Sequence, residues 1–181
     1  MGWVMHWISA PGALKRLKEA RAALLDVTPM KGDCGKLCNH ACCQPDETGE
    51  NGMLLYPYEE QLYRKPIEGF PFRLEPDDRL HKGGMRLICE GRCPREHRPL
   101  ACRIFPLRMR VTDVEGHTQV TAELDPRAWA VCPLPEEGGL RAMRQDFVAA
   151  VEQAGKRMCE STVLLMALLK EQQELDDTRK L

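Results

Sequence analysis

Apolar residues recur at helical spacing near the start of the chain. Between Ala13 and Asp26, leucines and alanines fall on one face of a helix, and most of the Lys and Arg side chains fall on the other. Pro29 follows and disfavours continuation of the helix. The pattern therefore predicts an amphipathic helix over residues 13–26.

The middle of the chain shows the spacing of β-structure. Apolar and polar residues alternate over 107–112 and 119–124, on either side of Asp113-Val114-Glu115-Gly116, which predicts a β-hairpin. A short strand is expected over 85–89. Residues 65–84 are rich in Pro, Gly and charge and predict irregular structure.

Helical periodicity returns from about residue 140 to residue 175. Gly155 is expected to kink or split this segment, which leaves one long helix or a helix pair. The expected core positions are Phe147, Val151, Met158, Leu165 and Leu169.

Together these patterns predict a helix-rich α+β fold in a single domain, 1–181. It comprises an N-terminal helix, an irregular cysteine-held middle over 34–132 that includes the hairpin, and a C-terminal helical segment over 140–175.

Composition narrows the function. The chain has 181 residues, a formal net charge of −1 and nine cysteines. A net charge so close to zero creates no overall electrostatic attraction to nucleic acid or membranes. No secretory signal, myristoylation pattern or membrane-spanning apolar run is recognisable. We therefore expect a cytoplasmic protein without membrane association, where clustered thiols more often hold metal than form disulfides.

Eight cysteines form two groups and a later single residue. They are Cys34, Cys38, Cys42, Cys43, Cys89, Cys93, Cys102 and Cys132. Thiolates are good ligands for zinc and iron. The ninth, Cys159, stands alone in a helical pattern and is interpreted as a small buried hydrophobe.

The spacing of the first group limits how it binds metal. Cys34, Cys38 and Cys42 on a straight helix span too far for one zinc ion, so the segment either bends tightly or serves more than one metal atom. The side chains of the adjacent Cys42 and Cys43 tend to diverge, so joint binding to one zinc ion would be strained, and a centre with several metal atoms suits them better. An iron–sulfur cluster is therefore slightly preferred to zinc as the cofactor.

The cysteine pattern resembles a known family. Cys34 to Cys43 ends in a Cys-Cys pair, and the later run Arg98-Pro99-Leu100-Ala101-Cys102-Arg103-Ile104-Phe105-Pro106 follows. Both are similar to the YkgJ-type family, a bacterial CxxCxxCC domain described as zinc- or iron-chelating. The early spacing is three and three here, not two and two. The resemblance implies a cofactor. The same cysteine-rich domain is similar to part of flagellin lysine N-methylase, which implies a metalloenzyme as one alternative.

A basic stretch over 82–110 accompanies the cysteines. It carries eight Lys or Arg against two Glu: Lys82, Arg86, Arg92, Arg95, Arg98, Arg103, Arg108 and Arg110. Compensation of thiolate charge is the preferred interpretation, with Arg98 and Arg103 beside Cys102 as the candidates. The alternative is a site for an anionic ligand, nucleic acid or a protein partner. His40 and His97 lie between cysteines and are candidate ligands or neighbours of the metal.

Three functions stay open at this point: a cofactor-binding protein with one cluster or a two-metal site, a metalloenzyme, and a zinc-stapled interaction module with a basic face.

Overall fold

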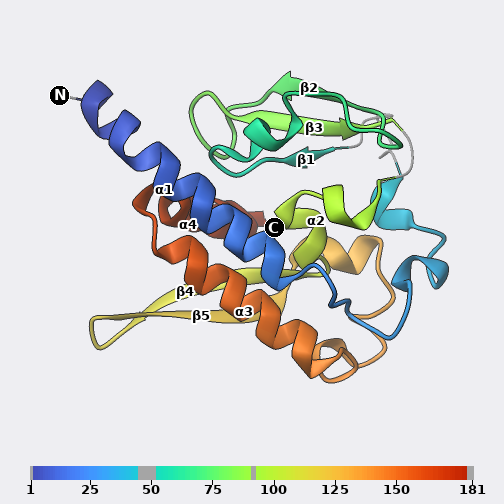
Figure 1. Cartoon of the computed structure of the whole chain (residues 1–181). Helices are drawn as coiled ribbons and strands as arrows, with labels where there is room; N and C mark the ends of the chain where they lie inside the picture. The colour runs from blue at the N-terminus through green and yellow to red at the C-terminus, as the bar shows by residue number, and fades with distance from the viewer. Residues whose placement is uncertain (1, 45–51, 91–92, 179–181) are drawn as a thin grey trace.

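The computed structural model describes residues 2–44, 52–90 and 93–178 and confirms a helix-rich α+β fold with a C-terminal helix pair. Helix α1 (Gly2–Ala23) crosses the molecule and packs on α3 (Gln145–Cys159) and α4 (Thr162–Thr178). The hairpin lies against α3, and a small sheet lies on the other side of α1 (Figure 1). The N-terminal helix is confirmed, although it begins earlier and ends three residues sooner than expected.

The C-terminal helices separate at Glu160 and Ser161, so the predicted break at Gly155 is wrong. Gly155 lies inside α3, where it lets the helix approach the hairpin. A Cβ at this position would stand 2.5 Å from Val120 Cγ1 and 3.1 Å from Met109 Sδ. The glycine therefore serves close packing and not a kink.

Burial along the helix pair follows the prediction in α3 and departs from it in α4. Phe147, Val151 and Met158 are fully buried, as expected. Leu165 is partly buried and packs against the core, whereas Leu169 is 38% exposed, so the assignment of Leu169 to the core is wrong. The neighbouring leucines of α4, Leu164 and Leu168, are the buried ones, one residue earlier in each case, and Leu175 is buried further along the helix. No helix in the described ranges is both long and apolar enough to cross a bilayer.

The hairpin forms where the alternation predicts it. Strands β4 (Leu107–Val114) and β5 (His117–Leu124) pair in antiparallel register from Leu107–Leu124 to Val114–His117. The turn is only two residues long, and Glu115 and Gly116 both have positive φ, 54° and 78°. This is the backbone of a type I′ turn, whose twist matches that of the paired strands.

A second, three-stranded antiparallel sheet has the order β1-β3-β2. Its strands are β1 (Met53–Leu54), β2 (Phe72–Pro76) and β3 (Met85–Cys89). The prediction of β3 is confirmed. Strand β2 lies within residues 65–84, so the prediction that this segment is irregular is wrong there. The alternation in β2 is short and enclosed by prolines, and it becomes a strand because β3 supplies its hydrogen bonds.

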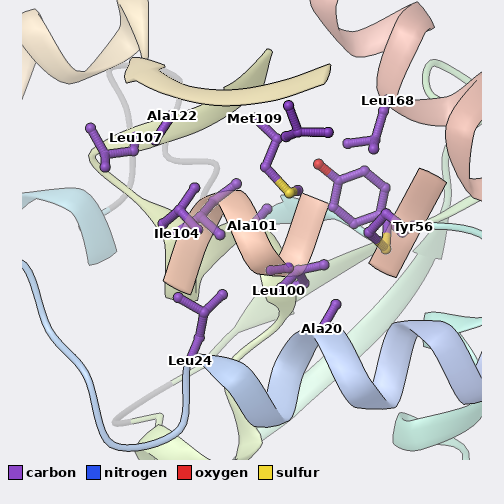
Figure 2. Packing of buried hydrophobic residues seen from close by; sticks show 14 of the residues in the cluster. Ala20, Leu24, Tyr56, Leu100, Ala101, Ile104, Leu107, Met109, Ala122 and Leu168 are labelled. Carbon is purple, nitrogen blue, oxygen red and sulfur yellow. The ribbon is translucent and has the colours of Figure 1, made fainter. Parts of the chain in front are cut away.

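The described residues form two hydrophobic cores. The larger joins α1, the hairpin and the C-terminal helices around the short helix α2 (Leu100–Ile104). Figure 2 shows Leu100, Ala101 and Ile104 of α2 between α1 and the hairpin. The smaller core lies beneath the three-stranded sheet and buries Leu55, Tyr63, Phe70 and Leu87. The cysteine-bearing segments meet at one end of the molecule, at the right of Figure 1.

Candidate metal centre

The segment from Cys34 to Cys43 bends sharply. It consists of two short 3-10 helices, η1 (Cys34–Lys36) and η2 (Ala41–Cys43). Asn39 and His40 separate them with positive φ values of 49° and 56°. These left-handed residues reverse the chain, so its cysteines do not lie along a straight helix. Of the two arrangements that the spacing allows, the structure therefore has the tight bend.

Three side chains specify this bend. Asp33 Oδ1 accepts a hydrogen bond from Gly35 N at 3.1 Å and caps η1. The ring of His40 lies over Gly35, where a Cβ would stand 2.1 Å from Nδ1. The His40 amide donates to the Gly35 carbonyl at 2.8 Å, and the Cys38 Sγ lies 3.9 Å from the same oxygen. Gly35 is therefore required for the turn that brings Cys38 back toward Cys34.

Cys42 and Cys43 form an exposed thiol pair at the end of the bend, with their Sγ atoms 3.9 Å apart. A hydrogen bond from Cys42 lowers the pKa of Cys43 to about 6, and the nearby Arg98 and His40 assist. The same hydrogen bond raises the pKa of Cys42, whose thiol donates. The pair therefore holds one thiolate at neutral pH.

Cys89 and Cys93 form a second thiol pair, and both pack against the smaller core. Cys89 is the last residue of β3 and lies opposite Phe72 in the sheet. A hydrogen bond from Cys93 lowers the pKa of Cys89 and raises that of Cys93. One member of this pair is therefore also the favoured thiolate.

Cys102 and Cys132 come from later segments. Cys102 lies on α2, and its pKa is raised by burial and by the charges of Cys89 and Cys43. Cys132 follows η5 (Pro126–Ala130), where its amide donates to the Ala128 carbonyl at 2.8 Å. Burial raises the pKa of Cys132, and the charge of Cys38 adds to this effect. Cysteines far apart in sequence are thus electrostatic neighbours.

Arg98 lies among the thiols. Its charge acts on Cys34 and Cys43, and also on the thiols of the later segments, namely Cys89, Cys93 and Cys102. The Arg98 Nε is buried and has no hydrogen-bond partner within the described residues. A buried N–H donor beside several sulfur atoms suits thiolates or sulfide, which accept such bonds and carry the opposite charge.

The other cations of the basic stretch are mostly engaged inside the protein. Arg103 donates to the carbonyls of Arg98, Arg21 and Glu96, and burial lowers its pKa to about 10. Arg95 donates to the carbonyls of Leu24, Leu25 and Val27, just after α1. Arg86 pairs with Glu75, and the Arg108 and Arg110 guanidinium groups reach Asp176. Arg92 lies outside the described residues.

The two histidines differ. The His40 imidazole lies within the bend and is 4.0 Å from Asp33 Oδ2. His97 lines a surface hollow with Arg103 and Tyr63, and its carbonyl accepts a hydrogen bond from Tyr63 Oη at 2.7 Å.

A buried polar network supports α2, and sequence reasoning did not identify it. Glu59 is fully buried, and its Oε1 accepts from Arg21 Nη1 at 2.6 Å and from Leu100 N at 2.8 Å. Arg21 also donates to Tyr63 Oη at 3.0 Å. The network therefore fixes the first residue of the helix that carries Cys102. A basic side chain on the apolar face of the predicted N-terminal helix was the available signal.

Cys159 lies apart from the other cysteines, near the end of α3, and packs partly buried against the larger core. Burial alone raises its pKa. This position agrees with a packing role.

The chemistry of the thiol ligands fits a soft metal, but their present spacing does not. Within the described residues, no three His, Cys, Asp or Glu side chains are arranged to hold a metal ion. The chain segments that carry the eight cysteines nevertheless lie at one end of the molecule. The Arg98 Nε is a buried N–H donor without a partner in the described residues. Binding would thus require the thiols to move closer, which couples it to local ordering.

Comparison with models of known protein families, with curated proteins and with solved structures found no match for this chain. The resemblance to the YkgJ-type family therefore stays an expectation from the cysteine motifs.

Proposed function

We propose that this chain is a metal-binding protein that holds its cofactor through the eight clustered cysteines. An iron–sulfur cluster is preferred to zinc or mononuclear iron. The observation that carries the proposal is that the 34–43 bend, the end of β3, α2 and the segment after η5 lie at one end of the molecule. There the charge of Arg98 acts on five of the eight thiols.

The arrangement supports metal more than independent buried thiols. Cys42 and Cys43 are exposed, and so are not simple core residues. Lowered thiol pKa values in both pairs supply the thiolates that soft metals bind. The cation that would offset the charge of a thiolate centre is already among them. A bound iron–sulfur cluster would supply electron transfer or fold stabilisation.

The internal pairing of most basic side chains does not favour an open anion-binding face as the main function. A redox-linked role belongs to the proposal only if the cofactor is an iron–sulfur cluster.

The test is metal analysis of the full chain purified without oxygen, with acid-labile sulfide and visible absorption measured on the same sample. Iron with equimolar sulfide supports the cluster, whereas zinc without colour supports metal binding and a structural centre. Cys102→Ser is expected to lose metal, and Cys159→Ser is the matched control that should keep it. A wild-type protein without metal, before and after reconstitution, whose eight thiols all alkylate freely, would refute the proposal.

A further inference from the structure

Strand β2 (Phe72–Pro76) leaves one edge of the three-stranded sheet open. Within the described ranges, β3 is the strand that pairs with it, because the order of the strands is β1-β3-β2 (Figure 1). An open edge presents backbone N–H and C=O groups on which an extended peptide can add a further strand. We propose that this edge, together with the hollow beside it, binds an extended acidic segment of a partner protein. This inference goes beyond the proposed function and does not depend on it.

The register shows which backbone groups of β2 face outward. Glu90 N donates to Pro71 O at 3.0 Å, immediately before β2 begins. Hydrogen-bonded and non-hydrogen-bonded pairs alternate along an antiparallel ladder, so Phe72 and Leu74 belong to non-hydrogen-bonded pairs with β3. Their N–H and C=O groups therefore point to the open edge. Because Pro71 and Pro76 enclose this stretch, the added strand is a short one.

A hollow of about 600 Å³ lies beside this edge, and Phe70, Phe72 and Leu74 belong to its lining. The Phe72 ring packs on Phe70, with ring centres 5.0 Å apart, and on Tyr63, with ring centres 5.5 Å apart. On an added strand, the residues opposite Phe72 and Leu74 direct their side chains to the same face of the sheet. Alternate side chains of the partner therefore enter the hollow, where apolar ones fit the aromatic surface.

The charged residues that line this hollow are all basic, namely Arg64, Lys65 and Arg73. Arg73 is paired with Glu75 and Glu90. Arg64 and Lys65 are exposed and have no ion pair within the described part of the chain. Their two positive charges complement carboxylates that flank the apolar residues of the bound segment.

A second hollow, of about 390 Å³, shares Tyr63 and Ile67 with the first, so the two adjoin. Its lining adds the exposed Lys18, with Glu96 as the acidic residue. Glu68 is exposed in the loop before β2 and does not line either hollow. The exposed charge along the joined hollows is therefore mainly positive. This charge favours an acidic partner over the β2 strand of a second copy, in which one Arg and one Glu balance.

The first experiment measures binding of a fluorescent peptide, Asp-Glu-Val-Thr-Ile-Thr-Glu-Asp, to the full chain by fluorescence polarisation. Saturable binding is expected, and a peptide with Lys in place of each acidic residue should bind about tenfold more weakly or worse. At saturation, amide hydrogen exchange at Phe72 and Leu74 should slow by about tenfold or more. No binding at millimolar peptide, equal binding of the basic peptide, or unchanged exchange at these two amides would each overturn the proposal.

The second experiment tests backbone pairing through the peptide alone, so folding of the protein is not affected. One peptide carries N-methyl groups on its Val and Ile, and the other carries them on its two Thr. Only alternate amides of an added strand donate to the edge of a sheet. One of the two methylated peptides should therefore bind about tenfold more weakly than the other, whereas equal affinity would overturn strand addition.

The third experiment reverses the exposed charges. Arg64→Glu with Lys65→Glu should weaken binding of the acidic peptide by about tenfold or more. Lys31→Glu with Lys156→Glu makes the same change in net charge at exposed positions outside both hollows, and should change affinity by less than about twofold. Equal weakening in the two proteins would overturn the assigned surface. Sedimentation of the free chain as a dimer that excludes the peptide would assign the edge to a second copy and overturn the acidic partner.

Discussion

Replacing Glu59 by Gln is expected to be among the most destabilising single changes near the site. The variant keeps the side-chain shape but removes the charge that compensates Arg21. The Glu59 side chain is fully buried and that of Arg21 is only 9% exposed, so solvent screens the remaining charge poorly. Leu100 N, at 2.8 Å from Oε1, and Tyr56 N, at 3.2 Å from Oε2, also depend on this carboxylate.

Breaking one side of a buried ion pair costs about 3–5 kcal/mol, because the other charge stays buried without compensation. With a urea m-value of about 2 kcal/mol/M, the unfolding midpoint should fall by roughly 1.5–2.5 M. Equilibrium urea unfolding, followed by circular dichroism, measures this shift. Glu60→Gln, at the next and less buried position, is the matched control and should change stability by less than about 0.5 kcal/mol.

A double variant separates the ion pair from general damage. Arg21→Met combined with Glu59→Gln removes both charges, so its cost should be smaller than the sum of the single costs by about 1–3 kcal/mol. Additive costs, or a Glu59→Gln cost below about 1 kcal/mol, would refute the argument that the pair is held in a buried environment. The same substitution should reduce metal retention, since Glu59 fixes the start of the helix that carries Cys102.

Three further results are expected. Gly155→Ala should lower the unfolding free energy by about 1–3 kcal/mol, because its Cβ would meet Val120 Cγ1 at 2.5 Å; no change in the urea midpoint would contradict this packing. Gly12→Ala, at an exposed position of α1 with nothing within 4 Å of the new Cβ, should instead raise stability by about 0.5–1 kcal/mol in the same assay. In metal-free protein, the rate of Cys43 alkylation should rise with pH around a midpoint near 6, because the Cys42 hydrogen bond lowers this pKa; Cys42→Ala should move the midpoint upward, and an unchanged midpoint would exclude that cause.

Local patterning predicted those elements whose own sequence carries a clear helical or alternating period. The hairpin follows from alternation around a turn, and both of its strands formed in the expected places. Strand β2 was missed because prolines and charges conceal a five-residue alternation, and its hydrogen-bonding partner is β3. The C-terminal break was misplaced because Gly155 has a tertiary role, and helical periodicity does not reveal the approach of Val120.

The candidate cysteines were recognisable from their clustering, but their neighbours were not. Cys132 acts electrostatically on Cys34, and Cys38 acts on Cys132, because η5 follows the hairpin and returns the chain to the larger core. The spacing of the first group left a tight bend or binding to more than one metal atom as alternatives, and the spacing alone does not reveal the bend. The positive φ of His40 produces the bend, and the His40 ring lies over Gly35, where no Cβ would fit; both features arise from the folded chain.

The two halves of the molecule are stabilised by different means. The helices and hairpin share the larger core, whose apolar burial can sustain them. The cysteine-bearing bend has little such burial, since Leu37 is 51% exposed and Cys42 and Cys43 are exposed as well. The smaller core fully or nearly buries only four side chains among the described residues, and the Glu59–Arg21 pair secures one edge of it. Bound metal would therefore contribute most where burial contributes least, by joining the bend to β3, α2 and the segment after η5.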